Sequence, residues 1–138
     1  MRFLSALNPQ FSSYLGVALG GALGSVLRFW ISGMLAHGPG EKFPVGTLVV
    51  NATGSFVIGF FATLTEPGGR VLAAPLTRQF FMIGICGGYT TFSSFSLQTL
   101  SLAREGEWLF AGANVLLSVL LCLGAVALGH LCAAALNR

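Results

Sequence analysis

The sequence contains no aspartate and little charge of either sign. Only 8% of its 138 residues are charged, whereas a typical soluble domain carries about 25%. Hydrophobic residues make up 54% of the chain. These proportions exclude an ordinary water-soluble domain. The few positive charges behind the net charge of +3 are scattered, so they form no basic patch for a nucleic acid.

Carboxylates are missing from the apolar parts of the chain. All four lie in loops or at span ends, namely Glu41, Glu66, Glu105 and Glu107. No carboxylate is therefore placed for proton coupling inside a membrane. The two histidines, His37 and His130, are far apart in sequence and near span ends, which supports neither a metal site nor a nucleophile–base pair. We expect no enzymatic function.

Cysteine is also scarce. Cys86, Cys122 and Cys132 are odd in number and fall inside apolar segments, so we interpret them as small packing residues rather than a disulfide framework. The first apolar segment is too long for a cleavable signal peptide and contains Arg28.

Four long runs contain no Lys, Arg, Asp or Glu: residues 3–27, 43–65, 79–103 and 108–137. About 20 apolar residues suffice to cross a bilayer. The runs predict an all-α membrane protein with four transmembrane helices, at Tyr14–Leu35, Val45–Leu64, Gln79–Leu102 and Leu109–Leu136. The loops are short, so we expect residues 1–138 to form a single transmembrane domain.

The loop charges are nearly balanced between the two sides of the membrane. Four spans place Arg2, Arg70, Arg78 and Arg138 on one side. Lys42 and Arg104, with Arg28 if it is not embedded, lie on the other. A near balance does not fix one orientation. It is compatible with insertion both ways and with an antiparallel homodimer, and one four-helix bundle offers little interior volume for a pore.

Glycines repeat every fourth residue in two spans. Gly16, Gly20 and Gly24 form one stripe, and Gly84 and Gly88 repeat the spacing. Small residues at this spacing let membrane helices approach closely. The sequence leaves open whether they pack helices within one subunit or between subunits.

A polar, glycine-rich stretch, Gly87–Ser96, interrupts the third apolar run. Paired glycines loosen the helical backbone and five hydroxyl residues follow, so the stretch predicts a break in the helix. Non-helical backbone at membrane depth occurs where it lines a cavity or binding site. Freed carbonyls there could hold a cation and freed N–H groups an anion. The alternative is a Gly-kinked helix whose Ser and Thr bond back to their own carbonyls.

Helical spacing beyond the break places Phe92, Phe95, Ser96 and Thr99 on one face. The positive edges of the two rings could hold an anion without a full charge, and a conducting site must bind only weakly. The alternative is that both rings simply pack against neighbouring helices.

Polar residues also recur in the other spans. Thr47, Asn51, Ser55 and Gly59 follow one another at every fourth position, and Asn114, Ser118 and Cys122 do so in the last span. The Asn51 amide could donate to a dehydrated anion. Asn51 and Ser118 could equally join helices. Thr47 is expected in a vestibule from the pattern alone.

Arg28 lies at the end of the glycine stripe, as the clearest charge embedded in a span. It either faces a water-filled vestibule, where it would attract anions, or reaches the headgroups as an anchor.

Together these motifs resemble the Fluc, or CrcB, family of fluoride channels. The resemblance rests on the stretch from Gly87 to Ser96 and on three supporting segments: Gly20–Arg28, Gly46–Asn51 and Asn114–Ser118. It covers nearly the whole chain. Two departures are Ser94, where the family more often has threonine, and Cys122, where some members have serine. We therefore carry no fluoride-contact role to Cys122.

The resemblance implies a dual-topology antiparallel homodimer that exports fluoride passively across the bacterial inner membrane. Phe92 and Phe95 would line the fluoride pathway, Asn51 would be its amide donor, and Ser118 would continue the polar track. Arg28 would correspond to the family's first-helix arginine. The backbone carbonyls of Gly87 and Thr90 would hold a structural sodium ion together with those of the second subunit.

Two other classes of membrane protein share some of these features. A small dual-topology exporter of cationic compounds would share the size and span count, but its usual membrane-embedded carboxylate is absent from the sequence. A nonconducting assembly subunit would not explain the polar stripes.

Overall fold

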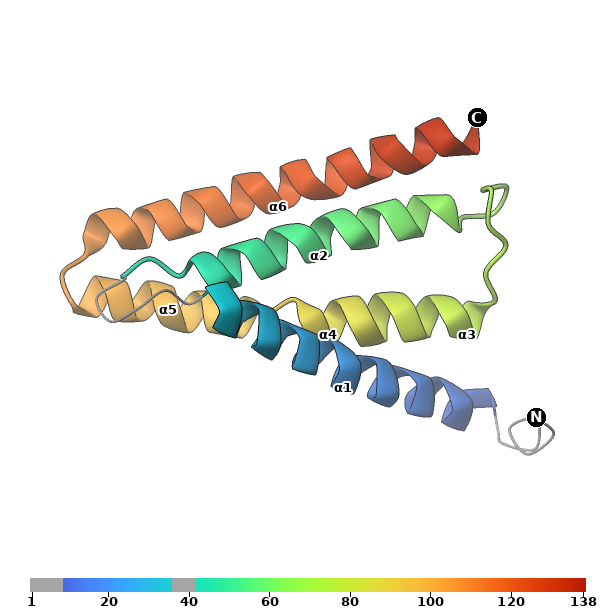
Figure 1. The fold of residues 1–138 in the computed structure, drawn as a ribbon, viewed down its shortest axis with the longest axis horizontal. Coiled ribbons are helices and arrows are strands. Elements are labelled where there is room, and N and C mark those ends of the chain that lie inside the picture. The colour runs from blue at the N-terminus through green and yellow to red at the C-terminus, as the bar shows by residue number, and fades with distance from the viewer. Residues whose placement is uncertain (1–8, 36–41) are drawn as a thin grey trace.

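The computed structural model describes residues 9–35 and 42–138, so His37 and Glu41 lie outside the described residues. All the regular structure within these ranges is helical. The elements in chain order are α1 (Pro9–Leu35), α2 (Val45–Leu64), α3 (Pro75–Arg78), the π-helical segment η2 (Gln79–Cys86), α4 (Gly87–Tyr89), α5 (Phe92–Arg104) and α6 (Trp108–Asn137). Figure 1 shows α3, η2, α4 and α5 as one bent rod beside α1 and α2.

The prediction of an all-α membrane protein with four spans and a broken third helix is confirmed. Four helices of the described chain are long and apolar enough to cross a membrane: Gln10–Leu35, Val45–Leu64, Pro75–Arg104 and Trp108–Asn137. The third begins at Pro75 rather than at Gln79, because proline is favoured in the first turn of a helix, where its missing N–H costs nothing.

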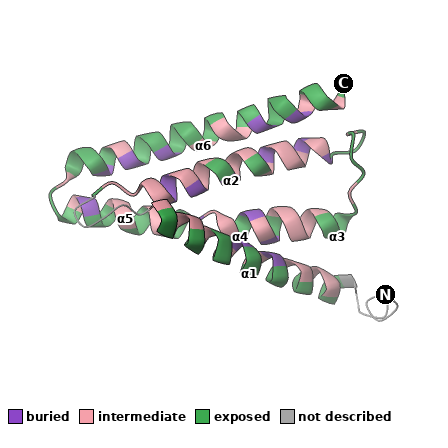
Figure 2. Cartoon of the chain, in the orientation of Figure 1, coloured by how far each residue is buried: buried purple, intermediate pink, exposed green. Residues whose placement is uncertain are grey.

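Large apolar residues are exposed on every span, and Figure 2 shows exposed positions along all the long helices. Phe29 is 84% exposed and Leu109 83%. The largest side chains that are fully buried are only Val50 and Asn114 among the described residues. Such a surface would be unstable in water but suits the hydrocarbon of a bilayer, where lipid tails are as apolar as the side chains themselves.

The glycine stripe of α1 packs against the third span of the same chain. A Cβ added to Gly20 would lie 2.5 Å from the Phe80 carbonyl oxygen, and one added to Gly24 would overlap the Ile85 carbonyl oxygen. Gly88 approaches the Gly21 carbonyl in the same way. For these positions the structure favours packing within one subunit.

The helices α2 and α6 lie side by side through a second glycine pair (Figure 1). Gly59 faces the backbone of Val126, and Gly129 faces the backbone of Phe56. In both cases a side chain would overlap a carbonyl oxygen. The helix α2 also contacts η2, α4 and α5 of the third span, where the site described below lies.

Two arginines satisfy the carbonyl ends of α2 and α6. Arg78 donates to the Thr65 carbonyl at 2.6 Å and to the Ala62 carbonyl at 3.3 Å. Arg70 donates to the Leu136 carbonyl at 3.1 Å. A cation at a helix C-terminus pairs with unsatisfied carbonyls and with the helix dipole, so both charges fix helix ends at the side where α1 begins.

Candidate functional site

The third span is interrupted at Thr90 and Thr91. Thr90 has φ −81° and ψ 157°, and Thr91 has φ −151° and ψ 117°, both extended, with helix on either side. A break is therefore present, and it is shorter than the polar stretch that predicted it. Hydroxyls also bond back as in the alternative prediction, with Thr90 Oγ1 donating to the Cys86 carbonyl at 2.9 Å, but they accompany the break rather than replace it.

The helix restarts at once because Thr91 caps α5. Its Oγ1 accepts a hydrogen bond from the Ser94 N–H at 3.2 Å. Threonine with extended backbone is a preferred N-cap, since its hydroxyl satisfies one of the first N–H groups of the helix.

Asn51 of α2 pairs with both backbone groups of Thr91. Its Nδ2 donates to the Thr91 carbonyl at 2.9 Å, and its Oδ1 accepts from the Thr91 N–H at 2.7 Å. The amide thus holds the break against α2 as a neighbouring strand would. A primary amide has two N–H groups, and the bond to Thr91 uses one of them.

The break takes the regular helical donors from several backbone carbonyls, which include those of Gly87 and Thr90. The Thr91 N–H, which an unbroken helix would direct to the Gly87 carbonyl, bonds to Asn51 instead. The Ser94 N–H, which would serve the Thr90 carbonyl, bonds to Thr91 Oγ1. Gly87 and Thr90 are the two residues from which the resemblance implied sodium ligands.

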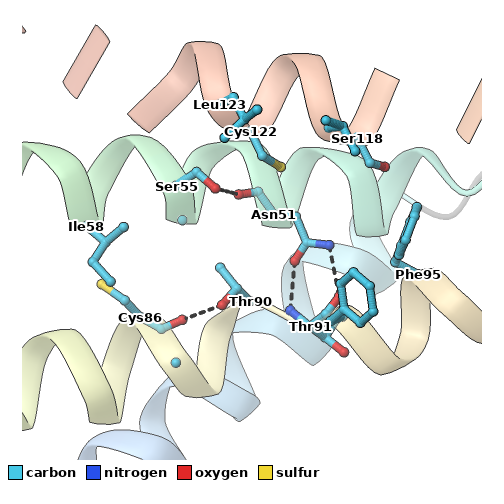
Figure 3. A pocket seen from close by; sticks show the side chains of 14 residues that line it. Asn51, Ser55, Ile58, Cys86, Thr90, Thr91, Phe95, Ser118, Cys122 and Leu123 are labelled. Atoms are coloured by element: carbon cyan, nitrogen blue, oxygen red, sulfur yellow. Dashed lines mark hydrogen bonds between the residues drawn. The ribbon is translucent and has the colours of Figure 1, made fainter. Parts of the chain in front are cut away.

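A pocket of about 420 Å³ lies against the break, between α2, α6 and the third span (Figure 3). Its walls include six of the eight residues named from the sequence: Asn51, Gly87, Thr90, Phe92, Phe95 and Ser118. In Figure 3 Asn51 reaches from α2 toward Thr91, while Ser118 and Cys122 descend from α6. Side chains from three spans thus meet at one place.

Two aromatic side chains, those of Phe92 and Phe95, belong to the lining of this pocket. Phe92 and Phe95 have ring centroids 5.3 Å apart, with planes tilted by 50°. The Phe92 ring is 79% exposed, so in the described chain it is not a core residue. A tilted pair is a favourable aromatic arrangement.

Ser118 belongs to a buried polar chain that joins α5 to α6. Asn114 is 1% exposed and donates through Nδ2 to Thr99 Oγ1 at 2.8 Å. Thr99 in turn donates to the Phe95 carbonyl at 2.8 Å, and Ser118 Oγ lies 3.5 Å from Asn114 Oδ1. The chain of contacts places the Ser118 hydroxyl beside the turn that carries Phe95.

Thr47 and Arg28 are not brought into this pocket. Thr47 is buried and lines a second pocket of about 590 Å³, beside Gln98 and Ser101. Arg28 is half-buried on α1 and lines neither pocket. Their expected roles in a vestibule therefore stay predictions.

A cation stands at the wall of the second pocket. Lys42 precedes α2 and donates a hydrogen bond to Glu107, the residue before α6. This hydrogen bond and the glutamate charge raise the pKa of Lys42 above its ordinary value. The ammonium therefore stays charged throughout the neutral range.

The residues of the pocket that received no role from the sequence include Thr91, Ser55 and Cys122. Thr91 and Ser55 line the pocket, and Cys122 lies one turn beyond Ser118 on its wall. The four-residue spacing of the polar stripes was a signal for Ser55 and Cys122. Thr91 bonds to Asn51 through its backbone atoms, and a contact of the backbone leaves no pattern in the sequence.

The fold and the pocket define a multi-pass membrane protein, with four spans and a polar cavity at a helix break. A family model described as "CrcB-like protein, Camphor Resistance (CrcB)" matches residues 15–130. The chain belongs to this family, which confirms the resemblance.

Named relatives cover almost the whole chain. The "Fluoride-specific ion channel FluC" of Rhodospirillum rubrum is 63% identical over 91% of this chain and 98% of its own length. The protein of the same name from Opitutus terrae is 63% identical over 91% of this chain and 96% of its own. That from Paramagnetospirillum magneticum is 57% identical. An ion channel is not an enzyme, so these relatives confirm the expectation of no enzymatic function.

Proposed function

We propose that this protein is a fluoride-selective passive channel that exports fluoride from the cytoplasm. The observation that carries the proposal is the pocket at the break, which gathers the Asn51 amide, the rings of Phe92 and Phe95 and the Ser118 hydroxyl. The name of the relatives supports the same substrate.

The chemistry of the pocket suits a small, strongly hydrated anion. Such an ion enters only where donors replace its water. One N–H of Asn51 remains beyond its bond to Thr91, and the hydroxyl of Ser118 and the ring edges add weak positive potential. No Lys or Arg belongs to this lining, so an anion can be bound loosely enough to leave.

Passive export follows from the membrane potential. Hydrogen fluoride crosses membranes as a weak acid and releases fluoride inside. A negative interior then favours outward movement of the anion by about 2.3 kcal/mol per 100 mV. A passive pathway alone is enough to lower the internal concentration, with no carboxylate for proton coupling.

A structural sodium ion would fit the break. The Gly87 and Thr90 carbonyls have lost their regular helical donors, and carbonyl oxygens at broken membrane helices are suitable ligands for such a cation. Two carbonyls are too few for a full coordination shell, so the same pair from a second subunit would complete it. The ion would supply positive charge that offsets the dipoles of these carbonyls.

The second subunit in this proposal is another copy in the opposite orientation, within the inner membrane of a bacterium. Gly87, Phe92, Ser93 and Ser96 are exposed in the described chain. Hydroxyls facing lipid are unfavourable, and an antiparallel copy would cover them.

A flux assay tests the function directly. Liposomes that hold the purified protein and potassium fluoride are expected to release fluoride when a potassium ionophore allows charge balance, and to retain chloride. Fluoride retained under the same conditions would refute the channel.

A further inference from the structure

A glycine of α2, Gly54, leaves the space in which the broken part of the third span lies. Gly54 is buried, and it follows Asn51 by three positions on the same helix. A Cβ added to it would overlap the Thr90 methyl group, Cγ2, and would lie 3.0 Å from Cδ1 of Tyr89. Real Cβ atoms essentially never come as close as the first of these contacts, so Thr90 or α2 would have to move.

Neither neighbour is free to turn away. Thr90 Oγ1 is held by its bond to the Cys86 carbonyl at 2.9 Å, and β-branched side chains are stiff about χ1. The Tyr89 hydroxyl lies 2.9 Å from Thr53 Oγ1. Rotating the Thr90 methyl would break the first bond, and moving the Tyr89 ring would strain the second. A side chain at position 54 would therefore push the backbone of Tyr89 and Thr90 away from α2.

Asn51 resists that displacement one residue later, because it holds both backbone groups of Thr91. The backbone between Thr90 and Thr91 would then be pushed by one residue of α2 and held by another. The φ and ψ angles of this segment can change easily, and they set the direction of the Thr90 carbonyl.

We propose that Gly54 is a positioning residue, whose missing side chain seats Thr90 against α2 and so aims the Thr90 carbonyl. The expected effect on ion flux rests on the proposed function. The steric fit of Thr90 against Gly54, which we call the seat, does not. Displacements of about 1 Å at a functional site can lower a rate about a hundredfold, so even a partial shift is expected to be measurable.

Four variants test the seat. Gly54→Ala adds the overlapping Cβ. Thr90→Ser alone is the second single change, which is needed to measure whether the effects at positions 54 and 90 are additive. Gly54→Ala with Thr90→Ser removes the methyl group that it meets and keeps the hydroxyl that bonds to Cys86. Gly112→Ala is the matched control, since a Cβ there meets nothing within 4 Å. Each is reconstituted for fluoride flux at several sodium concentrations, and its melting temperature is measured with and without sodium.

We expect Gly54→Ala to lower fluoride flux about tenfold or more and to need more sodium for half-maximal flux and for thermal stabilisation. The double variant should recover much of both, because the two changes meet at one contact and are not additive. Gly112→Ala should behave as the parent. If Gly54→Ala fails to assemble, recovery of assembly in the double variant supports the seat equally.

Two results would overturn the proposal. One is a Gly54→Ala protein indistinguishable from Gly112→Ala. The other is additive effects of the two changes on melting temperature, with no recovery in the double variant. Failure of the channel proposal has a different signature, in which the parent carries no fluoride while the melting temperatures still show coupling between positions 54 and 90.

Discussion

Asn51 supplies the third span with two hydrogen bonds that a continuous helix would have made within itself. Its contacts with the Thr91 N–H and carbonyl, at 2.7 and 2.9 Å, satisfy backbone groups that water cannot reach in hydrocarbon. The two readings of Asn51 from the sequence, an anion donor or a link between helices, are therefore not exclusive. The same amide can link helices through one N–H and present the other to the pocket.

Replacement of this amide is expected to impair stability and flux together. Asn51→Ala leaves the Thr91 N–H without its partner and removes the Asn51 bond to the Thr91 carbonyl, at a cost of about 1–3 kcal/mol for a buried group left unpaired. Asn51→Asp keeps an acceptor for the Thr91 N–H but turns an oxygen toward the Thr91 carbonyl. We expect both variants to melt at lower temperature and to lose most fluoride flux. Val57→Ala, at an exposed position of the same helix, is the control. Equal melting temperatures in Asn51→Ala and Val57→Ala would contradict a stabilising role for the hydrogen bonds between Asn51 and Thr91.

Replacing Phe92 and replacing Phe95 should affect flux and melting temperature differently. Phe92 is 79% exposed, so Phe92→Ile removes few contacts within the subunit and is expected to lower flux with little change in melting temperature. Phe95 lies half-buried on the turn that receives Thr99, so Phe95→Ile should lower both. Fluoride efflux and thermal unfolding measured on the same preparations decide this. Full flux in both variants would mean that the rings only pack.

At the scale of elements, the sequence predicted what hydropathy and local composition control. The predicted second span, Val45–Leu64, is that of the structure, and the break falls inside Gly87–Ser96. The place of the break within that stretch was not predictable, because it depends on Asn51 of another helix meeting Thr91. The π-helical turns of Gln79–Cys86 carry no local signature either, since they accompany close packing of this segment on α1.

That packing makes a prediction about α1. In Gly24→Ala the new Cβ overlaps the Ile85 carbonyl, whereas in Gly21→Ala, three positions earlier on the same helix, it meets nothing within 4 Å. Overpacking of this kind costs about 1–3 kcal/mol. We expect Gly24→Ala to unfold at lower denaturant concentration than the parent and Gly21→Ala to match it. The reverse order would show that α1 does not rest on the third span as described.

At the scale of the whole molecule, the described chain leaves the pocket at the break partly uncovered. Its lining includes Gly87 and Phe92, which are both exposed. The sequence could not indicate which surface would pair with a second copy, because an apolar face toward lipid and one toward a subunit have the same composition. Its charge balance did indicate how a copy could be oriented.

That balance can be altered to test dual topology. Leu72, 91% exposed in the loop after α2, and Glu105, exposed after α5, lie on opposite sides of the membrane. Because positive loops are retained in the cytoplasm, Leu72→Lys and Glu105→Lys should bias the chain toward opposite orientations. Reporter fusions at the C-terminus would measure the orientation of each variant.

If the working unit is an antiparallel pair, each biased variant expressed alone should lose fluoride efflux, because partners of the required orientation become rare. The two variants expressed together should recover it, since each supplies the orientation that the other lacks. The double variant, with both charges on one chain, restores the balance and is the matched control for the substitutions themselves. Full efflux from a strongly biased single variant would instead mean that parallel subunits, or a lone subunit, carry the ion.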